Sequence, residues 1–287
     1  MSGVLTLVAT PIGNLGDLSP RAVEAFASAD LVCCEDTRRT GSLLKHAGVR
    51  AAELRRLDDH TEFEAIPDVL DRLREGQQVV LVSDAGMPGI SDPGERLVAA
   101  VAEAGFDVTT VPGPVAALAA LVSSGLPSGR FVFEGFLARK GQERAAQLSA
   151  IAAERRTTVL YESPNRLGAA LAALAEACGP DRRAVVAREL TKLHEELRRG
   201  TLVELADWAG GGVKGEIVLV IAGADAPAAP EDDALVARLD TLMSEGASRR
   251  DAIDRVAAET GERRSRIYDL ALGMDAGPIR RGVTPPS

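Results

Sequence analysis

Apolar residues follow two alternating patterns along the first half of the chain. Short continuous runs bounded by Gly, Pro or Asp predict buried strands, and these runs cover residues 4–9, 31–34, 79–82 and 108–111. Between the runs, apolar residues recur every three or four positions, which predicts helices that begin at Pro20 or span 65–74 and 94–104. Strands that are buried on both faces and alternate with helices are typical of a mostly parallel α/β sheet.

A second block of predicted strands and helices starts near Gly129. Its expected strands span 131–133, 157–161, 184–187 and 216–222, and its expected helices span 145–153 and 167–178. Turn residues at 127–129 predict a boundary at this point. We therefore expect two α/β domains, over residues 1–127 and 128–223.

The rest of the chain has a different composition. Residues 224–233 are rich in Pro and Ala and predict a linker. Apolar periodicity then predicts three helices within 234–274, and the last two have helix-turn-helix spacing around Gly261. A small helical cap or a dimer contact fits the same pattern. The tail at 275–287 contains three prolines and is expected to be disordered.

Charge and composition exclude several classes of protein. The chain has 33 Lys and Arg against 42 Asp and Glu, a formal net charge of −9, which argues against coating nucleic acid by bulk charge. Local basic patches remain compatible with RNA binding because salt screens charges beyond about 8 Å. Aromatic residues make up only 3% of the chain, which disfavours a platform for base stacking.

Other sequence features point to the reducing cytoplasm. No apolar run is long enough for a membrane span, and the N-terminus lacks the pattern of a secretory signal. Three cysteines form neither a disulfide framework nor a zinc motif, and the three histidines lack metal-site spacing. We expect a cytoplasmic protein that holds no metal.

The segment 83–94 is the strongest candidate for a ligand-binding loop. It contains three glycines and two prolines directly after a predicted strand, where open α/β sheets bind ligands. Its only charged residues are Asp84 and Asp92, so it suits a cationic centre or hydroxyl groups better than a phosphate. An ordinary turn is the alternative. The loop at 9–17 lacks the leading glycine of a dinucleotide motif, and the chain contains no P-loop.

Eight segments carry a family resemblance over about residues 5–223. In chain order they read ATPIGNLGDLSPRA, CEDTRRTGSLL, VSDAGMPGISDPG, PGPVAAL, EGFLARK, YESPNR, ARELTKLHEE and KGEIVLVI. This succession resembles the tetrapyrrole-methylase-like (class III) methyltransferases, and within them the members that methylate ribosomal RNA. The resemblance implies S-adenosylmethionine as the methyl donor and a cytidine ribose 2′-hydroxyl in the decoding region of 16S rRNA as the acceptor. It also implies two domains with the cofactor in the cleft between them, and a homodimer.

The same resemblance implies which residues meet the cofactor. They lie in the loops after the first and third predicted strands, in the PGPVAAL turn and in the second domain. They are Pro11, Ile12, Asp84, Ala85, Gly86, Met87, Pro88, Val115, Ala116, Tyr161 and Leu190.

The catalytic group is left open between two segments at strand ends. A 2′-hydroxyl is a poor nucleophile, so we expect a side chain that takes its proton, or positioning that makes one unnecessary. The candidates are Glu35, Asp36 and Arg38 in the first segment and Arg188, Glu189 and Lys192 in the second. Lys192 would act as a base only if its pKa were lowered. A purely structural set of salt bridges is the alternative.

Contacts with RNA are expected from arginines and a lysine in two regions. Those near the cleft are Arg39 and Lys45, and those near the helix-turn-helix turn are Arg249, Arg250, Arg263, Arg264 and Arg266. Two other functions stay open at this point: methylation of a tetrapyrrole or another small molecule, and a non-catalytic role in RNA binding or ribosome assembly.

Overall fold

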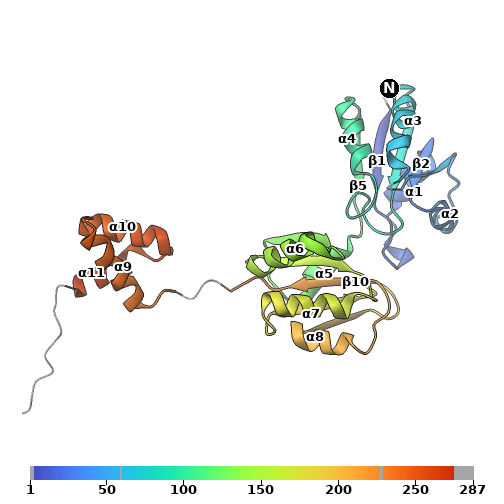
Figure 1. Cartoon of the computed structure of the whole chain (residues 1–287). Coiled ribbons are helices and arrows are strands. Elements are labelled where there is room, and N and C mark those ends of the chain that lie inside the picture. The colour runs from blue at the N-terminus through green and yellow to red at the C-terminus, as the bar shows by residue number, and fades with distance from the viewer. Residues whose placement is uncertain (1–2, 59, 226–228, 275–287) are drawn as a thin grey trace, which may run out of the picture. The chain divides into compact units, whose positions relative to one another are not determined.

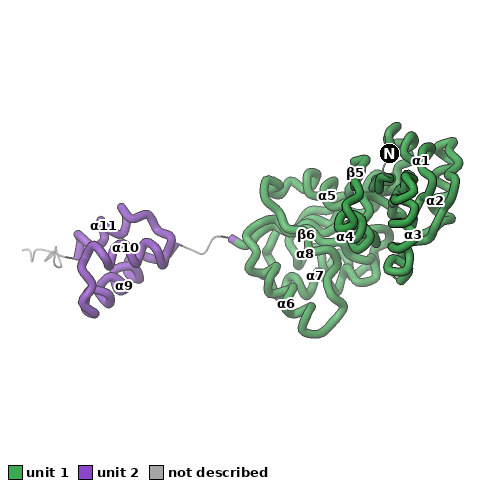
Figure 2. The backbone as a smooth tube through the Cα atoms, turned by 90° about the horizontal axis from the view of Figure 1, so that it is seen from above, with its two compact units in different colours: residues 1–224 green, residues 225–287 purple. Residues whose placement is uncertain are grey.

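The computed structural model describes residues 3–58, 60–225 and 229–274, and the chain divides into two compact units. Unit 1 spans Met1–Ala224 and unit 2 spans Asp225–Ser287 (Figure 2). Unit 1 contains two five-stranded sheets, and unit 2 is helical. Among the described helices, none is both long and apolar enough to cross a membrane.

The first sheet is entirely parallel, in the order β3-β2-β4-β1-β5. Three of its strands, β1, β2 and β5, are labelled in Figure 1. Its strands are β1 (Val4–Val8), β2 (Leu31–Cys34), β3 (Leu54–Arg56), β4 (Gln78–Val82) and β5 (Asp107–Val111). Its helices are α1 (Pro20–Ser28), α2 (Thr37–His46), α3 (Glu62–Arg74) and α4 (Glu95–Glu103), with a 3₁₀ turn η1 (Leu15–Asp17).

Helices cover both faces of this sheet. Successive residues of a strand point to opposite sides, so each strand packs against both helical layers. Leu31 and Cys33 pack with α3 and α4, whereas Val32 and Cys34 pack with α1 and α2. The mostly parallel α/β sheet expected from the apolar runs is therefore confirmed.

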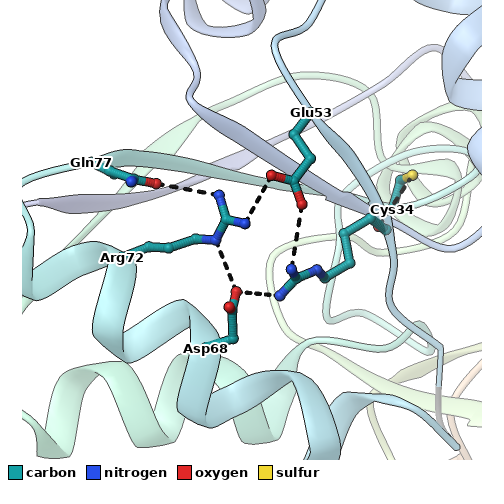
Figure 3. A network of polar contacts seen from close by, with 6 residues as sticks. Cys34, Glu53, Asp68, Arg72 and Gln77 are labelled. Atoms are coloured by element: carbon teal, nitrogen blue, oxygen red, sulfur yellow. Dashed lines mark hydrogen bonds and ion pairs between the residues drawn. The ribbon is translucent and has the colours of Figure 1, made fainter.

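The edge strand β3, which the apolar pattern does not predict, is fastened by charged side chains (Figure 3). Arg72 on α3 bonds Asp68 Oδ2 through Nε at 2.8 Å and Glu53 Oε2 through Nη2 at 2.8 Å. Arg55 on β3 pairs with the same two carboxylates. The network stabilises a polar three-residue strand that has few apolar contacts of its own.

The second sheet has the order β6-β7-β10-β8-β9 and is mixed. Its strands are β6 (Phe131–Phe136), β7 (Thr157–Glu162), β8 (Arg183–Arg188), β9 (Glu196–Thr201) and β10 (Ile217–Ile221). Only β6 and β7 pair in parallel, and the other three pairs are antiparallel.

Helices also cover both faces of the second sheet. Three of them share one core cluster: α6 (Gly141–Ala153), α7 (Leu167–Cys178) and α8 (Leu202–Ala209). The opposite face is covered by α5 (Ala116–Ser124), whose Leu121 packs with Val159 and Val220. The first predicted domain, 1–127, thus includes a helix that packs on the second sheet, and the exact domain bounds stay a prediction.

Unit 2 is a three-helix cluster made of α9 (Asp232–Ser244), α10 (Arg249–Thr260) and α11 (Arg264–Gly273). Leu239, Val256 and Ile267 are fully buried at its centre. Gly261, at φ +70°, ends α10 in a left-handed conformation. The expected disordered tail at 275–287 and residues 226–228 of the expected linker lie outside the described residues.

A buried carboxylate fixes the end of the glycine-rich loop. Glu62 on α3 is only 3% exposed, and its Oε1 accepts hydrogen bonds from the backbone N–H of Gly94 at 3.1 Å and of Leu97 at 2.9 Å. These N–H groups belong to the start of α4 and have no partner within the helix. Glu62 therefore caps α4 from a neighbouring helix and anchors the loop before it.

We predict that Glu62→Ala lowers the free energy of unfolding by about 2 kcal/mol, because it leaves two buried N–H groups without acceptors. Glu64→Ala on the same helix, at an exposed position, is the matched control and should change it by less than about 0.5 kcal/mol. Urea unfolding of both variants measures the difference. Equal effects at the two positions would contradict the capping role.

Candidate active site

Two loops are joined at the carboxyl edge of the first sheet. The N–H of Thr10, after β1, donates to the carbonyl of Gly86 at 2.9 Å, and the N–H of Gly86 donates back at 3.1 Å. Gly86 has φ +85°, a conformation that β-branched residues avoid. We call this pairing the Thr10–Gly86 bridge. Cavities open on both sides of it.

The first cavity has a volume of about 390 Å³, which lies within the ~300–1,000 Å³ typical of small-ligand sites. Eight residues predicted to bind the cofactor line it: Ile12, Ala85, Gly86, Met87, Val115, Ala116, Tyr161 and Leu190. The side chains with a formal charge in its lining are Asp92, Glu162 and Glu216, with no Lys, Arg or His among these lining residues. We call it the acidic cavity, and its charge favours a ligand with a cationic centre.

The second-sheet wall of the acidic cavity is held in place by aromatic and charged contacts. The Tyr161 ring packs edge-on against Phe133, with centroids 5.0 Å apart, and its Oη accepts a hydrogen bond from the N–H of Ala117 at 3.3 Å. Burial raises the pKa of Tyr161, so the phenol stays protonated. Glu162 is buried and pairs with Arg166 at 3.2 Å.

The second cavity, of about 580 Å³, lies on the other side of the bridge. Its walls come from the ends of β1 and β4, from η1 and from α2, and its charged or titratable lining residues are Arg39, Lys45, His46 and Asp84. We call it the basic cavity. Both residues predicted to contact RNA near the cleft, Arg39 and Lys45, line it.

The structure divides the predicted cofactor residues between the cavities. Pro11 and Asp84 line the basic cavity, whereas their neighbours Ile12 and Ala85 line the acidic one. Pro88 is buried in the loop and is not among the lining residues of either cavity.

Sequence reasoning missed other lining residues of the acidic cavity. They are Ile90, Ser91, Asp92, Phe136, Glu162, Ser163, Pro164, Gly215, Glu216, Ile217 and Val218. All lie within motifs that carried the family resemblance, in the glycine-rich loop or in EGFLARK, YESPNR and KGEIVLVI. The motifs therefore contained the signal for these residues.

The first catalytic candidate segment is a network around the start of α2. Asp36 caps this helix by accepting from the N–H of Arg38 at 2.8 Å, and it also pairs with the Arg38 guanidinium at 3.1 Å. The hydrogen bond from that guanidinium lowers the pKa of Asp36 to about 2, which makes it a weak base. Asp84 joins the network by accepting from the N–H of Asp36 and pairing with Arg39, both at 3.1 Å. Glu35 is half-buried at the end of β2.

The second candidate segment has a strained backbone. Glu189 and Thr191 have φ of +52° and +66°, which is unusual for residues other than glycine. Glu189 Oε1 accepts from Lys192 Nζ at 2.9 Å and from the N–H of Glu216 at 2.9 Å, and Lys192 also pairs with Glu216 at 3.0 Å. Arg188, the last residue of β8, pairs instead with Glu196 at 3.0 Å.

Lys192 is held in its charged form. Partial burial works against its charge, but the hydrogen bonds to Glu189 and Glu216 outweigh burial and raise the pKa of the ammonium. The N–H of Glu216, and then Lys192 itself, lower the pKa of Glu189. Lys192 was expected to act as a base only if its pKa were lowered. Because its pKa is raised instead, Lys192 does not fit that role.

The Glu189–Lys192 segment lies against the loop that follows β1. A Cβ on Gly13 would overlap Cγ of Lys192 and would lie 2.9 Å from Oγ1 of Thr191, so only glycine permits this close approach. Oγ1 of Thr191 is itself buried without a hydrogen-bond partner. An unpaired buried hydroxyl costs about 1–3 kcal/mol, so this segment has a second unfavourable feature besides its strained backbone.

In unit 2, some of the arginines that were predicted to contact RNA are paired with carboxylates. Arg264 pairs with Asp254 at 2.6 Å, and Arg266 pairs with Asp232 at 2.7 Å. Arg249 and Arg250 begin α10, and Arg263 precedes α11. Among the described residues, no group of three or more His, Cys, Asp or Glu could hold a metal ion.

Comparison with known proteins gives consistent matches. Residues 4–206 match the family model of tetrapyrrole (corrin/porphyrin) methylases. Proteins named ribosomal RNA small subunit methyltransferase I match almost end to end. The one from Synechocystis sp. is 48% identical and covers 96% of this chain and 99% of its own, and the one from Mycobacterium tuberculosis strain H37Rv is 49% identical over 94% and 95%.

Solved structures share the fold of unit 1. The methyltransferase CobJ superposes with a TM-score of 0.59 at 23% identity, covering 78% of this chain and 95% of its own. Diphthine synthase gives a TM-score of 0.60 at 18% identity, covering 77% and 90%. The motif resemblance is confirmed: the chain belongs to the tetrapyrrole (corrin/porphyrin) methylase family and, within it, to the ribosomal RNA small subunit methyltransferase I group.

Proposed function

We propose that this protein is an S-adenosylmethionine-dependent methyltransferase of 16S rRNA that modifies the 2′-hydroxyl of a cytidine ribose in the decoding region. The observation that carries the proposal is the pair of cavities of opposite charge on the two sides of the Thr10–Gly86 bridge. One suits a cationic methyl donor and the other suits the RNA backbone. The names of relatives that are 43–49% identical support rRNA as the substrate.

The residues of the acidic cavity fit S-adenosylmethionine. When bound, this molecule supplies a methyl group activated by a positively charged sulfur. The carboxylates of Asp92, Glu162 and Glu216 line the cavity, whereas Arg166 and Lys192, the cations that pair with Glu162 and Glu216, are not among its lining residues. Apolar walls such as Ile12 and Leu190 suit the adenine.

Lys192 would act on the acceptor oxygen. Its ammonium is anchored by Glu216, which lines the acidic cavity, while its stem lies on Gly13, the residue after Ile12 of the same lining. A fixed cation there would hold the ribose hydroxyl and stabilise the negative charge that develops as the proton leaves to solvent. Positioning of the hydroxyl against the methyl group supplies the rest of the rate enhancement.

A homodimer in the cytoplasm belongs to the same proposal. Cytoplasmic location follows from the proposed rRNA substrate. An apolar patch on α5 supports the dimer: Leu118 and Val122, four positions apart, are 45% and 72% exposed.

The cofactor assignment predicts the effect of changing the bridge. Gly86→Val forces a β-branched residue to φ +85° and should weaken S-adenosylmethionine binding about tenfold or more. Gly105→Val is the matched control, with a similar φ of +79° and open space around it, and should bind normally. Met87→Thr should also bind nearly as wild type, because the loop contacts are expected to come from the backbone. Calorimetric titration gives the affinities, and full affinity in Gly86→Val would refute the assignment.

The role of Lys192 predicts a loss in rate rather than in binding. Lys192→Met should lower kcat about a hundredfold and leave S-adenosylmethionine affinity within a few-fold of wild type. Lys192→Arg should retain part of the rate, and Lys214→Met, at an exposed position, should retain all of it. Single-turnover methylation assays separate these effects. A wild-type rate in Lys192→Met would remove the residue from the mechanism.

The dimer predicts a mass of two chains in light scattering. Val122→Asp should shift the mass to one chain because it places a charge in the apolar interface, whereas Val203→Asp, at a 40% exposed valine on α8, should not. A wild-type mass of one chain at every concentration would contradict the dimer.

The function itself is tested with purified protein and S-adenosylmethionine labelled in the methyl group. We expect label in the ribose of 16S rRNA, presented free or in small subunits, and none in uroporphyrinogen III. Label only in the tetrapyrrole would support the small-molecule alternative. Binding of RNA without cofactor binding or transfer would support a non-catalytic role.

A further inference from the structure

The basic cavity is an open recess with a buried floor and an exposed rim. The α2 residues that line it recur at helical spacing, with Arg39, Ser42, Leu43 and His46 three or four positions apart. Thr10 and Ser83, at the ends of β1 and β4, close its floor, and both are buried. One face of α2 therefore lines the basic cavity, whose lining is adjacent in sequence to that of the acidic cavity.

The charges in this recess favour an anion. Arg39 is anchored through Asp84 at 3.1 Å, which fixes its direction but leaves its side chain 69% exposed. Lys45 and His46 have no acidic partner among the described residues. Lys45 therefore offers an unneutralised cation in a chain whose formal net charge is −9.

The remaining lining suits the other parts of a nucleotide. Leu15, which is 47% exposed, and Leu43 give apolar surface for a base or a sugar face. The Ser42 hydroxyl is exposed and can bond a ribose hydroxyl. A phosphate, a sugar and a base would each find a partner within one recess.

The position of the recess relates it to the transfer reaction. Pro11 and Asp84 line it, and the next residue of each loop, Ile12 and Ala85, lines the acidic cavity. Each of the two loops therefore passes from the lining of one cavity to the lining of the other between consecutive residues. An RNA chain that placed one nucleotide in the basic cavity would bring the adjacent one to the mouth of the acidic cavity.

We propose that the basic cavity binds the nucleotide adjacent to the methylated one, with its phosphate on Lys45 and Arg39 and its sugar and base against Ser42, Leu43 and Leu15. This inference rests on the proposed function and assigns one subsite of the RNA to one recess.

The test uses one variant that removes charge and one that fills the recess, both at exposed positions. Lys45→Ala and Ser42→Trp should each raise the KM for 16S rRNA about tenfold, as expected for loss of a charged hydrogen bond or of the subsite. Cofactor affinity should be unchanged. Lys45→Ala should also reduce the slope of log affinity against log salt by about 0.7, the value for one contact to single-stranded RNA.

Arg96→Ala is the matched control. Arg96 is an exposed arginine on α4, which packs on the opposite face of the first sheet from α2. An equal rise in KM in this variant would show a bulk charge effect and overturn the subsite. An unchanged KM in both cavity variants of an enzyme that methylates rRNA would overturn it as well, and would leave the proposed function standing.

A separate probe covers the case in which no methylation of rRNA is found, which would refute the proposed function. The dinucleotide cytidylyl-cytidine is titrated into wild type, Ser42→Trp and Arg96→Ala. Binding that is lost only in Ser42→Trp supports the recess as a nucleotide site. Absence of binding to wild type overturns it.

Discussion

The two hydrogen bonds between Thr10 and Gly86 determine what the carboxyl edge of the first sheet can bind. They join the loops after β1 and β4, which are neighbouring parallel strands, so each loop crosses from one cavity to the other at the bridge. Glu62 secures the far end of the second loop through the start of α4. The loop is therefore held at both ends, which fixes the position of its backbone at the edge of the cavities.

Separation of charge follows from this partition. The carboxylates of Asp92, Glu162 and Glu216 line one side, and Arg39 and Lys45 line the other. In the proposed function, a cationic cofactor and an anionic polymer would otherwise compete for the same surface, and the bridge keeps the acidic and the basic lining residues apart. An unpaired Lys192 ammonium would weaken the binding of a nearby sulfonium, but Glu189 and Glu216 balance its charge. The strained backbone at 189 and 191 is consistent with a segment held for function.

Much of the fold could be predicted from the sequence, because buried parallel strands leave unbroken apolar runs such as 79–82. The strands that escaped prediction are polar edges. β3 depends on the Arg55 and Arg72 network, and β9 reads Glu-Leu-Arg-Arg-Gly-Thr, with no apolar alternation. The antiparallel pairing of β10 could not be predicted either, because a run of buried residues does not indicate the direction of its strand.

The candidate site shows the same limit at the level of single residues. Turn-forming residues identified the glycine-rich loop, but they could not tell that Asp84 and Ala85 face different cavities. That division depends on a bridge between residues far apart in the chain, Thr10 and Gly86. Likewise, the charge state of Lys192 depends on Glu216 from another segment, which spacing along the chain does not reveal.

We propose that this chain transfers a methyl group to a ribose of 16S rRNA. The most direct measurement maps ribose methylation along 16S rRNA from a strain that lacks the gene and from the same strain carrying it again. We expect one 2′-O-methylcytidine in the decoding region to disappear in the first strain and to return in the second. An unchanged methylation map in the two strains would contradict it.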